Sequence, residues 1–150
     1  MKAPRANGPS TLCSANDELR RRLACSLRGE GIEFGPGTQP LAVGPLVRRV
    51  RYCDRVDRAT FLSTYPELAA LHDQVPETID YIWDFEEVDF ACRLGRESVD
   101  FVIANHVLEH LVNPLLFLTR VHAVLREGGS FYLAIPDKRS IFDRDRERTR

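Results

Sequence analysis

Short apolar runs alternate with amphipathic stretches along most of the chain. Five segments carry apolar residues in unbroken or alternating runs, and we expect these segments to be β-strands. They cover residues 31–34, 47–53, 79–83, 99–104 and 130–135. The last of them is almost wholly apolar, which is typical of a strand covered on both faces.

A first helix is expected near the N-terminus. Residues 1–15 are rich in Pro, Gly, Ser and Asn, which favours a flexible leader. Asn16 is a suitable N-cap for the segment that follows it. One face of that segment carries leucines at helical spacing, namely Leu19, Leu23 and Leu27.

Two further helices are expected later in the chain. Residues 59–72 have apolar positions at helical spacing, and Pro66 either opens a second helical turn there or kinks the helix. Residues 114–126 form the other helix, with Asn113 as its N-cap and the glycine pair at 128–129 as its end. The segment between the first two strands is a poor helix former, because prolines and glycines interrupt it.

The order of these elements predicts the architecture. Strands that alternate with helices form a parallel sheet with helices on both faces and right-handed crossovers. We therefore expect one α/β domain over residues 16–136, a Rossmann-like three-layer sandwich with a mostly parallel sheet, followed by a charged tail over residues 137–150. A length of 150 residues fits a single domain.

Composition and charge narrow the class of protein. Hydrophobic residues make up 43% of the chain and charged residues 29%, and the net charge is -1. This balance gives no argument for nucleic acid or an anionic membrane as a partner. Four arginines lie away from the leucines of the first helix, and we interpret them as a solvated surface, with a basic docking surface as the alternative. They are Arg20, Arg21, Arg22 and Arg28.

The cysteines and the lack of long apolar runs indicate the cellular compartment of the protein. No apolar run reaches the ~20 residues that a membrane span needs, and the N-terminus has no apolar segment typical of a secretory signal. Cys13, Cys25, Cys53 and Cys92 form no C-x-x-C pair, which argues against a zinc ribbon or a thioredoxin-type motif. Scattered thiols are typical of a reducing environment, so we expect a cytoplasmic protein.

The candidate chemistry lies directly after the predicted strands. In an open parallel sheet, ligands bind beyond the carboxyl ends of the strands, and these ends meet at one edge. Four strand ends carry distinctive residues. They are Glu33-Phe34-Gly35-Pro36-Gly37, Asp54, Asp84-Phe85 and Asn105-His106.

Each of these groups has a physical use. The turn from Gly35 to Gly37 exposes backbone N–H groups that can hold an anion. Asp54 can accept the two hydroxyls of a ribose. Asp84 can read the amino group of an adenine, and Phe85 can cover the ring. Singly each is an ordinary turn or loop residue, but together they describe a nucleoside that carries an anionic group.

These motifs resemble those of class I S-adenosylmethionine-dependent methyltransferases, in the branch with a Glu-x-Gly-Pro first motif. The resemblance covers roughly residues 29–146, and its most specific elements are Val107-Leu108-Glu109-His110-Leu111 and Leu125-Arg126-Glu127-Gly128-Gly129. The other matching segments are Ile32 to Gly37, Tyr52-Cys53-Asp54, Trp83-Asp84, Val99 to His106, and Ala134-Ile135-Pro136-Asp137-Lys138-Arg139.

The resemblance implies roles for the cofactor S-adenosyl-L-methionine. Glu33 and the backbone of Phe34, Gly35 and Gly37 would contact its methionine part, and the backbone of Asn105 would approach its amino group. The ribose would meet Asp54, and the adenine would meet Asp84 and Phe85. The same resemblance implies a small-molecule or glycan acceptor.

The resemblance also implies that His106 borders the substrate. A base is needed only where the acceptor is a hydroxyl or an ammonium, and His106 or His110 is suited to that role. His106 is the candidate catalytic residue, while packing within the turn is the ordinary role of His110.

The chain departs from the family pattern at two places. Gln39-Pro40 replaces the usual third small residue of the glycine-rich turn. The sequence also stops soon after the fifth strand, whereas the family sheet continues, so we expect a truncated form with an exposed sheet edge through which a homodimer can form. A non-catalytic, methyltransferase-like binding protein is therefore the alternative function.

Two other site types remain as alternatives. The segment His106-Val107-Leu108-Glu109-His110 fits the H-x-x-E-H pattern of zinc peptidases, although Asn113-Pro114 breaks any helix soon after it. A nicotinamide-dinucleotide site needs G-x-G-x-x-G, whose last glycine is replaced here by Pro40. We expect no metal site.

Overall fold

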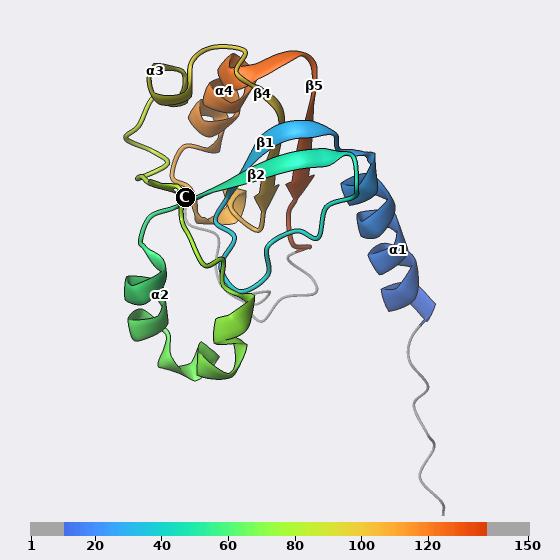
Figure 1. Cartoon of the computed structure of the whole chain (residues 1–150), viewed down its shortest axis with the longest axis vertical. Coiled ribbons are helices and arrows are strands. Elements are labelled where there is room, and N and C mark those ends of the chain that lie inside the picture. The colour runs from blue at the N-terminus through green and yellow to red at the C-terminus, as the bar shows by residue number, and fades with distance from the viewer. Residues whose placement is uncertain (1–10, 138–150) are drawn as a thin grey trace, which may run out of the picture.

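The computed structural model describes residues 11–137 of the chain. Its helices and strands follow one another in α/β order (Figure 1). They are α1 (Thr11–Ser26), β1 (Gly29–Phe34), β2 (Val47–Asp54), α2 (Arg58–Thr64), the 3₁₀ helix η1 (Pro66–Gln74), β3 (Tyr81–Ile82), α3 (Phe90–Leu94), β4 (Val99–Asn105), the 3₁₀ turn η2 (Leu108–His110), α4 (Pro114–Val124) and β5 (Leu125–Ala134).

All neighbouring strands of the five-stranded sheet are parallel, in the order β3-β2-β1-β4-β5. The strand order reverses at β1, which pairs with β2 on one side and β4 on the other. This confirms the predicted α/β class and the parallel sheet. It also brings the carboxyl ends of all five strands to the same side of the molecule.

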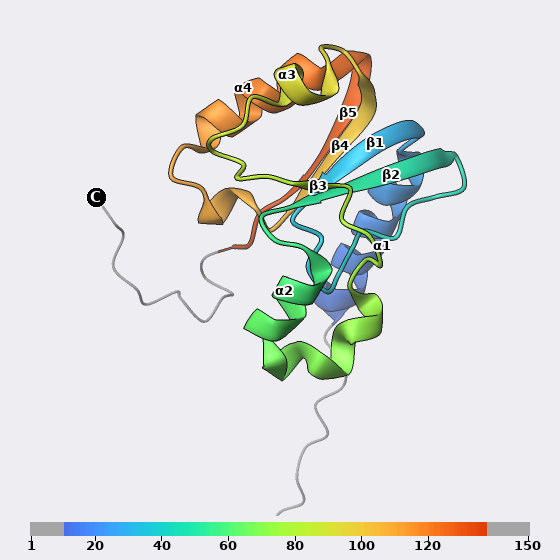
Figure 2. The ribbon, with the colours of Figure 1, turned by 60° about the vertical axis from the view of Figure 1, so that its left-hand side comes forward.

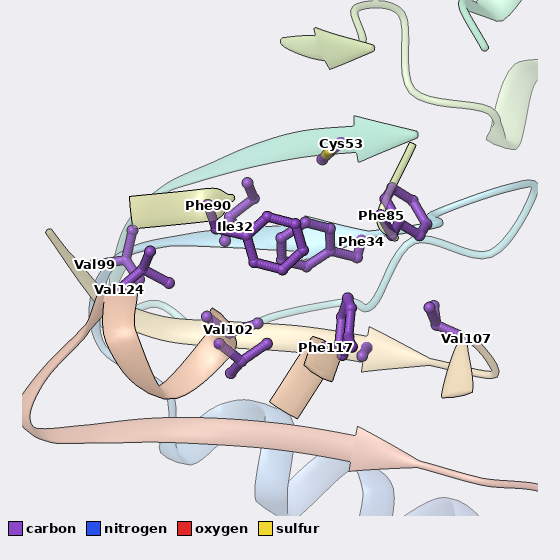
Figure 3. Packing of buried hydrophobic residues seen from close by; sticks show 12 residues of the cluster. Ile32, Phe34, Cys53, Phe85, Phe90, Val99, Val102, Val107, Phe117 and Val124 are labelled. Atoms are coloured by element: carbon purple, nitrogen blue, oxygen red, sulfur yellow. The ribbon is translucent and has the colours of Figure 1, made fainter. Parts of the chain in front are cut away.

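One face of the sheet is covered by α3 and α4 and holds the larger core (Figure 3). Phe34 of β1 lies at its centre and packs against Phe85, Phe90 and Phe117, with ring centroids 4.7 to 5.4 Å apart. Edge-to-face and stacked aromatic pairs of this kind add to the free energy gained by burying the rings.

The other face has a smaller core, covered by the end of α1 and by the loop between β1 and β2. Leu27 packs there on Phe101, Ile103 and Tyr132 of the sheet. That loop contains no helix, as its prolines and glycines predict, and its Gly44 passes so close to α1 that a Cβ would lie 2.8 Å from the Cα of Cys25.

Two short helical segments lie beyond the carboxyl end of β2 rather than on a face of the sheet (Figure 2). Asp57 caps α2 by accepting a hydrogen bond from the N–H of Thr60. Pro66 stands at the first turn of η1, so it opens a second helical segment as expected. None of the helices in the described part of the chain is long and apolar enough to cross a membrane.

The structure corrects the predicted helix boundaries. Helix α1 begins at Thr11, so Asn16 lies inside it rather than at its cap. Asn113 does cap α4, by accepting from the N–H of Leu116, but that helix ends at Val124. The pair Gly128-Gly129 belongs to β5, because Leu125 already pairs with Val99 and starts the strand.

Three further predictions need correction or lie outside the described residues. The strand expected at 79–83 is reduced to Tyr81–Ile82, and the short helix α3 was not predicted. Strand β5 is at the edge of the sheet and exposes Leu133, and Ile135 directly after it is also exposed, so the segment is not covered on both faces. Residues 1–10 of the expected leader and residues 138–150 of the charged tail lie outside the described residues.

Candidate functional site

The predicted site residues follow four adjacent strands. In the order of the sheet, Asp84 follows β3, Asp54 ends β2, the glycine turn follows β1, and Asn105 ends β4. Because these strands are parallel, the structure brings the four groups together at the carboxyl rim of the sheet. We call these four strand ends the rim.

The turn after β1 depends on its two glycines. Gly35 has a φ of 62° and Gly37 a φ of 49°, a left-handed conformation that residues with a Cβ seldom adopt. The N–H of Gly35 donates to the carbonyl of Cys53 (2.9 Å), and the N–H of Gln39 donates to the carbonyl of Pro36 (3.0 Å). A Cβ on Gly37 would meet nothing closer than 4.0 Å, so backbone conformation rather than crowding explains this glycine.

Asp54 lies beside the glycine turn, and the two line the same narrow hollow. Its carboxylate accepts a hydrogen bond from the backbone N–H of Arg55 (2.7 Å). Burial raises the pKa of Asp54, while the backbone N–H groups of Arg55 and Gly37 and the charge of Arg55 act in the opposite direction. The carboxylate is half-buried and therefore still faces the rim.

Asp84 is fixed through one of its two oxygens. Its Oδ1 accepts from the N–H of Glu86 (2.8 Å) and lies 3.5 Å from a guanidinium nitrogen of Arg55. The same nitrogen is 3.5 Å from Glu86 Oε2, so Arg55 spans the ends of β2 and β3. Sequence reasoning missed Arg55, although its position next to Asp54 was the available signal.

The two aromatic residues of the predicted site belong to the core. Phe34 is fully buried, and Phe85 is only 5% exposed. The guanidinium carbon of Arg55 lies 5.7 Å from the centroid of the Phe85 ring. The backbone at Phe34 and Phe85 is at the rim, but their side chains form its floor.

Glu33 is buried on the opposite face from its neighbours. Ile32 and Phe34 point into the aromatic core, so the alternation of a strand directs Glu33 to the face covered by α1. Both carboxylate oxygens lie close to the N–H of Leu41, at 3.0 and 3.2 Å. Burial raises the pKa of Glu33 to about 7, and the hydrogen bond from Leu41 opposes the rise. Glu33 thus anchors the loop that replaces a helix after β1.

At the end of β4, the side chain of Asn105 is bound by a residue of α1. Asn105 Oδ1 accepts a hydrogen bond of 2.8 Å from a guanidinium nitrogen of Arg20. Sequence reasoning placed Arg20 among solvated arginines. A contact between residues 85 positions apart leaves no local signal.

His106 is exposed and has a strained backbone. Its φ is 59°, and its N–H donates to the carbonyl of Ala134 (2.9 Å), which fixes the backbone at the end of β5. Its Nδ1 lies 3.2 Å from Glu109 Oε1. A carboxylate at this distance favours the tautomer with the proton on Nδ1, which leaves Nε2 as the acceptor.

The geometry does not provide the helix that a zinc peptidase motif needs. That motif requires two histidines on one helical face, whereas His106 precedes the short 3₁₀ turn Leu108–His110. Within residues 11–137, no group of three or more His, Cys, Asp or Glu side chains is placed to hold a metal ion.

Hollows lie at both ends of the sheet. One of ≈ 260 Å³ lies at the rim, between α1, residues 39–42 and Asn105. A larger one of ≈ 630 Å³ lies at the amino ends of β1 and β4, around Asp100. Asp100 accepts hydrogen bonds from the N–H of Glu30 (2.8 Å) and from Arg126 (2.6 Å). We assign the site to the rim, because the ends of four adjacent parallel strands bring the candidate residues together there.

The comparisons with known proteins agree with this architecture. The family model of the methyltransferase domain matches residues 9–150. A candidate methyltransferase from Bacillus halodurans superposes with a TM-score of 0.55 at 21% identity, over 78% of this chain and 49% of that one. A candidate methyltransferase from Haloferax volcanii, solved in complex with the Trm112 methyltransferase activator, superposes with a TM-score of 0.51 at 17% identity, over 83% of this chain and 55% of that one.

The matches to solved structures concern the fold. At such identities the two solved structures show a shared fold alone, and the chain spans about half of their length. No functionally curated protein matches the sequence.

Proposed function

Since the chain belongs to the methyltransferase-domain family, we propose that it binds S-adenosylmethionine at the rim and transfers the methyl group to a small-molecule or glycan acceptor. The hydrogen bond from the N–H of Gly35 to the carbonyl of Cys53 carries this proposal. It holds the glycine turn, which suits the rest of a nucleoside, next to Asp54, the carboxylate that suits a ribose.

The residues at the rim fit this cofactor. An adenosine laid across the sheet would have its adenine beside Asp84, its ribose beside Asp54 and its tail above the glycine turn, because this is the order of the strands. Asp84 uses Oδ1 for its contacts with the protein, so Oδ2 supports recognition of an adenine amino group. The positive φ values of Gly35 and Gly37 support a close approach of the ligand to the backbone.

The chemistry asked of the protein is mainly positioning. When bound, the cofactor supplies a methyl group on a sulfonium, which an acceptor displaces in line. The rim residues hold the two reactants in orientation, which accounts for much of the rate enhancement in such reactions. His106 would accept a proton at Nε2 where the acceptor is a hydroxyl or an ammonium, with Glu109 holding Nδ1.

The test is calorimetric titration with S-adenosylhomocysteine, the demethylated product. We expect the chain to bind it, and Asp54→Ala to weaken binding by roughly 1–3 kcal/mol, because the ribose hydroxyls lose a charged acceptor. Glu127→Ala is the matched control, since Glu127 is an exposed acid on β5 near the opposite end of the sheet. An Asp54→Ala variant that binds as tightly as the unmodified chain would contradict the assignment.

A second function is binding without methyl transfer. The position of β5 at the edge of the sheet favours it, because an edge strand suits a partner strand. Leu133 on β5 is 37% exposed, and Ile135, directly after the strand, is 56% exposed. The discriminating measurement is transfer of a labelled methyl group to small-molecule and glycan acceptors. Cofactor binding without any transfer supports this second function.

A further inference from the structure

The C-terminal end of helix α1 is packed against the core, whereas the turns just before it are exposed. Ala24 and Leu27, near its end, are 1% and 3% exposed. One and two turns earlier, Leu23 and Leu19 are 49% and 54% exposed. Between Asp17 and Leu23, α1 therefore gains little from apolar burial. Its polar contacts with the rim determine where it lies.

Arg20 makes such a contact. Its guanidinium donates to Asn105 Oδ1 at 2.8 Å, which joins α1 to the end of β4. The contact closes one side of the rim hollow of ≈ 260 Å³, whose walls are Asp17, Arg20, Arg21 and Ala24 from α1, residues 39–42 from the loop, and Asn105.

The charge of Arg20 is not matched by Asn105. Arg21 in the same wall forms an ion pair with Glu18 at 2.6 Å, whereas Asn105 is a neutral amide. A guanidinium has five N–H donors, and an amide oxygen takes only part of this capacity. The ligand group that best fits an arginine fork is a carboxylate, which accepts two parallel hydrogen bonds. Asp17, which also lines the hollow, limits how much negative charge fits there.

The position of Arg20 along the sheet agrees with one particular carboxylate. From Asp84 on β3 to Asn105 on β4 there are three strand spacings, or roughly 14 Å. A nucleoside extended from Asp84 across Asp54 and the glycine turn would bring its amino-acid tail to Asn105. Arg20 then stands beyond the last atoms of that tail.

The geometry points to Arg20 as the residue that binds the carboxylate of the cofactor's amino-acid end, with Asn105 holding the guanidinium in place. This inference rests on the proposed function. It assigns to α1 a direct part in the site.

The test compares two ligands that differ only in the amino-acid end. S-adenosylhomocysteine has the carboxylate, and 5′-deoxy-5′-methylthioadenosine lacks the whole amino-acid group. Titration of the 150-residue chain with each ligand is repeated for Arg20→Ala, Arg20→Lys and the control Arg22→Ala. Arg22 is exposed and lies on the same helix outside the hollow.

We expect Arg20→Ala to weaken S-adenosylhomocysteine binding by roughly ten-fold or more, because a charge-assisted hydrogen-bond pair is lost. Binding of methylthioadenosine should not change. Arg20→Lys should lie between the two, since lysine keeps the charge without the fork. Arg22→Ala should bind both ligands as the unmodified chain does.

The other outcomes overturn the inference in different ways. Equal weakening of both ligands would mean that Arg20 only positions α1. No change for either ligand would mean that another group binds the carboxylate, or that Arg20 serves an anionic acceptor. If the unmodified chain binds neither ligand, the result contradicts the proposed function itself rather than the role assigned to Arg20.

Discussion

The two faces of the sheet differ in how they are built. The face covered by α3 and α4 is dry and aromatic, with Phe34, Phe90 and Phe117 fully buried or nearly so. The face covered by α1 has few buried apolar residues and holds the buried carboxylate of Glu33. The first face therefore supplies most of the packing energy. The second carries a loop and a helix end held by polar contacts.

This difference has a consequence for the site. Close-packed aromatic residues resist displacement, because any gap loses many favourable contacts. Segments held by hydrogen bonds and fewer apolar contacts, such as the loop at Leu41 and the part of α1 at Arg20, open at lower free energy. The rim thus combines fixed strand ends with a cover that can adjust to a ligand.

The largest expected effect is on the aromatic face. Phe117→Ala should lower the free energy of unfolding by roughly 3–5 kcal/mol, because it opens a cavity beside Phe34. Leu27→Ala on the other face should cost less, about 2–3 kcal/mol, since its cover can collapse onto the gap. Urea denaturation measures both. Equal losses would remove the contrast between the two faces.

The next effect is the pH dependence that Glu33 imposes. Its pKa is about 7 in the folded chain against an ordinary value of 4.5, so between these values the folded state binds more protons than the unfolded state. Stability should therefore fall as pH rises from about 4.5 to 7, by on the order of 3 kcal/mol, and level off above that range.

Glu33→Gln separates this effect from the rest of the protein. A glutamine can still accept from the N–H of Leu41 but does not ionise, so the fall in stability over this pH range should disappear. The exposed acid Glu127, replaced by Gln, is the control. Urea titrations at several pH values measure the slope, and a Glu33→Gln variant that keeps it would refute the assignment.

The smallest expected loss of stability is at the rim, which belongs to neither face of the sheet. Arg55→Ala removes contacts of 3.5 Å to Asp84 and Glu86 between side chains that are 44%, 42% and 24% exposed. Ion pairs of this kind contribute little, so we expect a loss of unfolding free energy below about 1 kcal/mol. A loss as large as that of Phe117→Ala would show that the rim is part of the core.

Much of the fold was predictable because it depends on local patterns. Apolar runs identified all five strands, and Asn113 identified the start of α4 through ordinary capping chemistry. The glycine pair 128–129 led to a wrong end for helix α4, because such pairs often end helices. The strand in fact begins earlier, where Leu125 pairs with Val99. Helix α3 has only five residues, too few for a helical period to be visible.

The site was predictable in part, for a similar reason. The residues that directly follow strands meet at the rim because parallel strands share a direction. The contact of Arg20 with Asn105 and the bond from Leu41 to Glu33 depend on how α1 and an irregular loop lie over the sheet. No periodicity or spacing encodes such placements.

The most direct test of the account is a titration of the ¹⁵N-labelled chain with S-adenosylhomocysteine, followed by amide chemical shifts. The account predicts that the largest changes occur at Gly35, Gly37, Asp54, Asp84 and Asn105. Changes concentrated instead around Asp100 and Gly128, in the larger hollow at the amino ends of the strands, would contradict it.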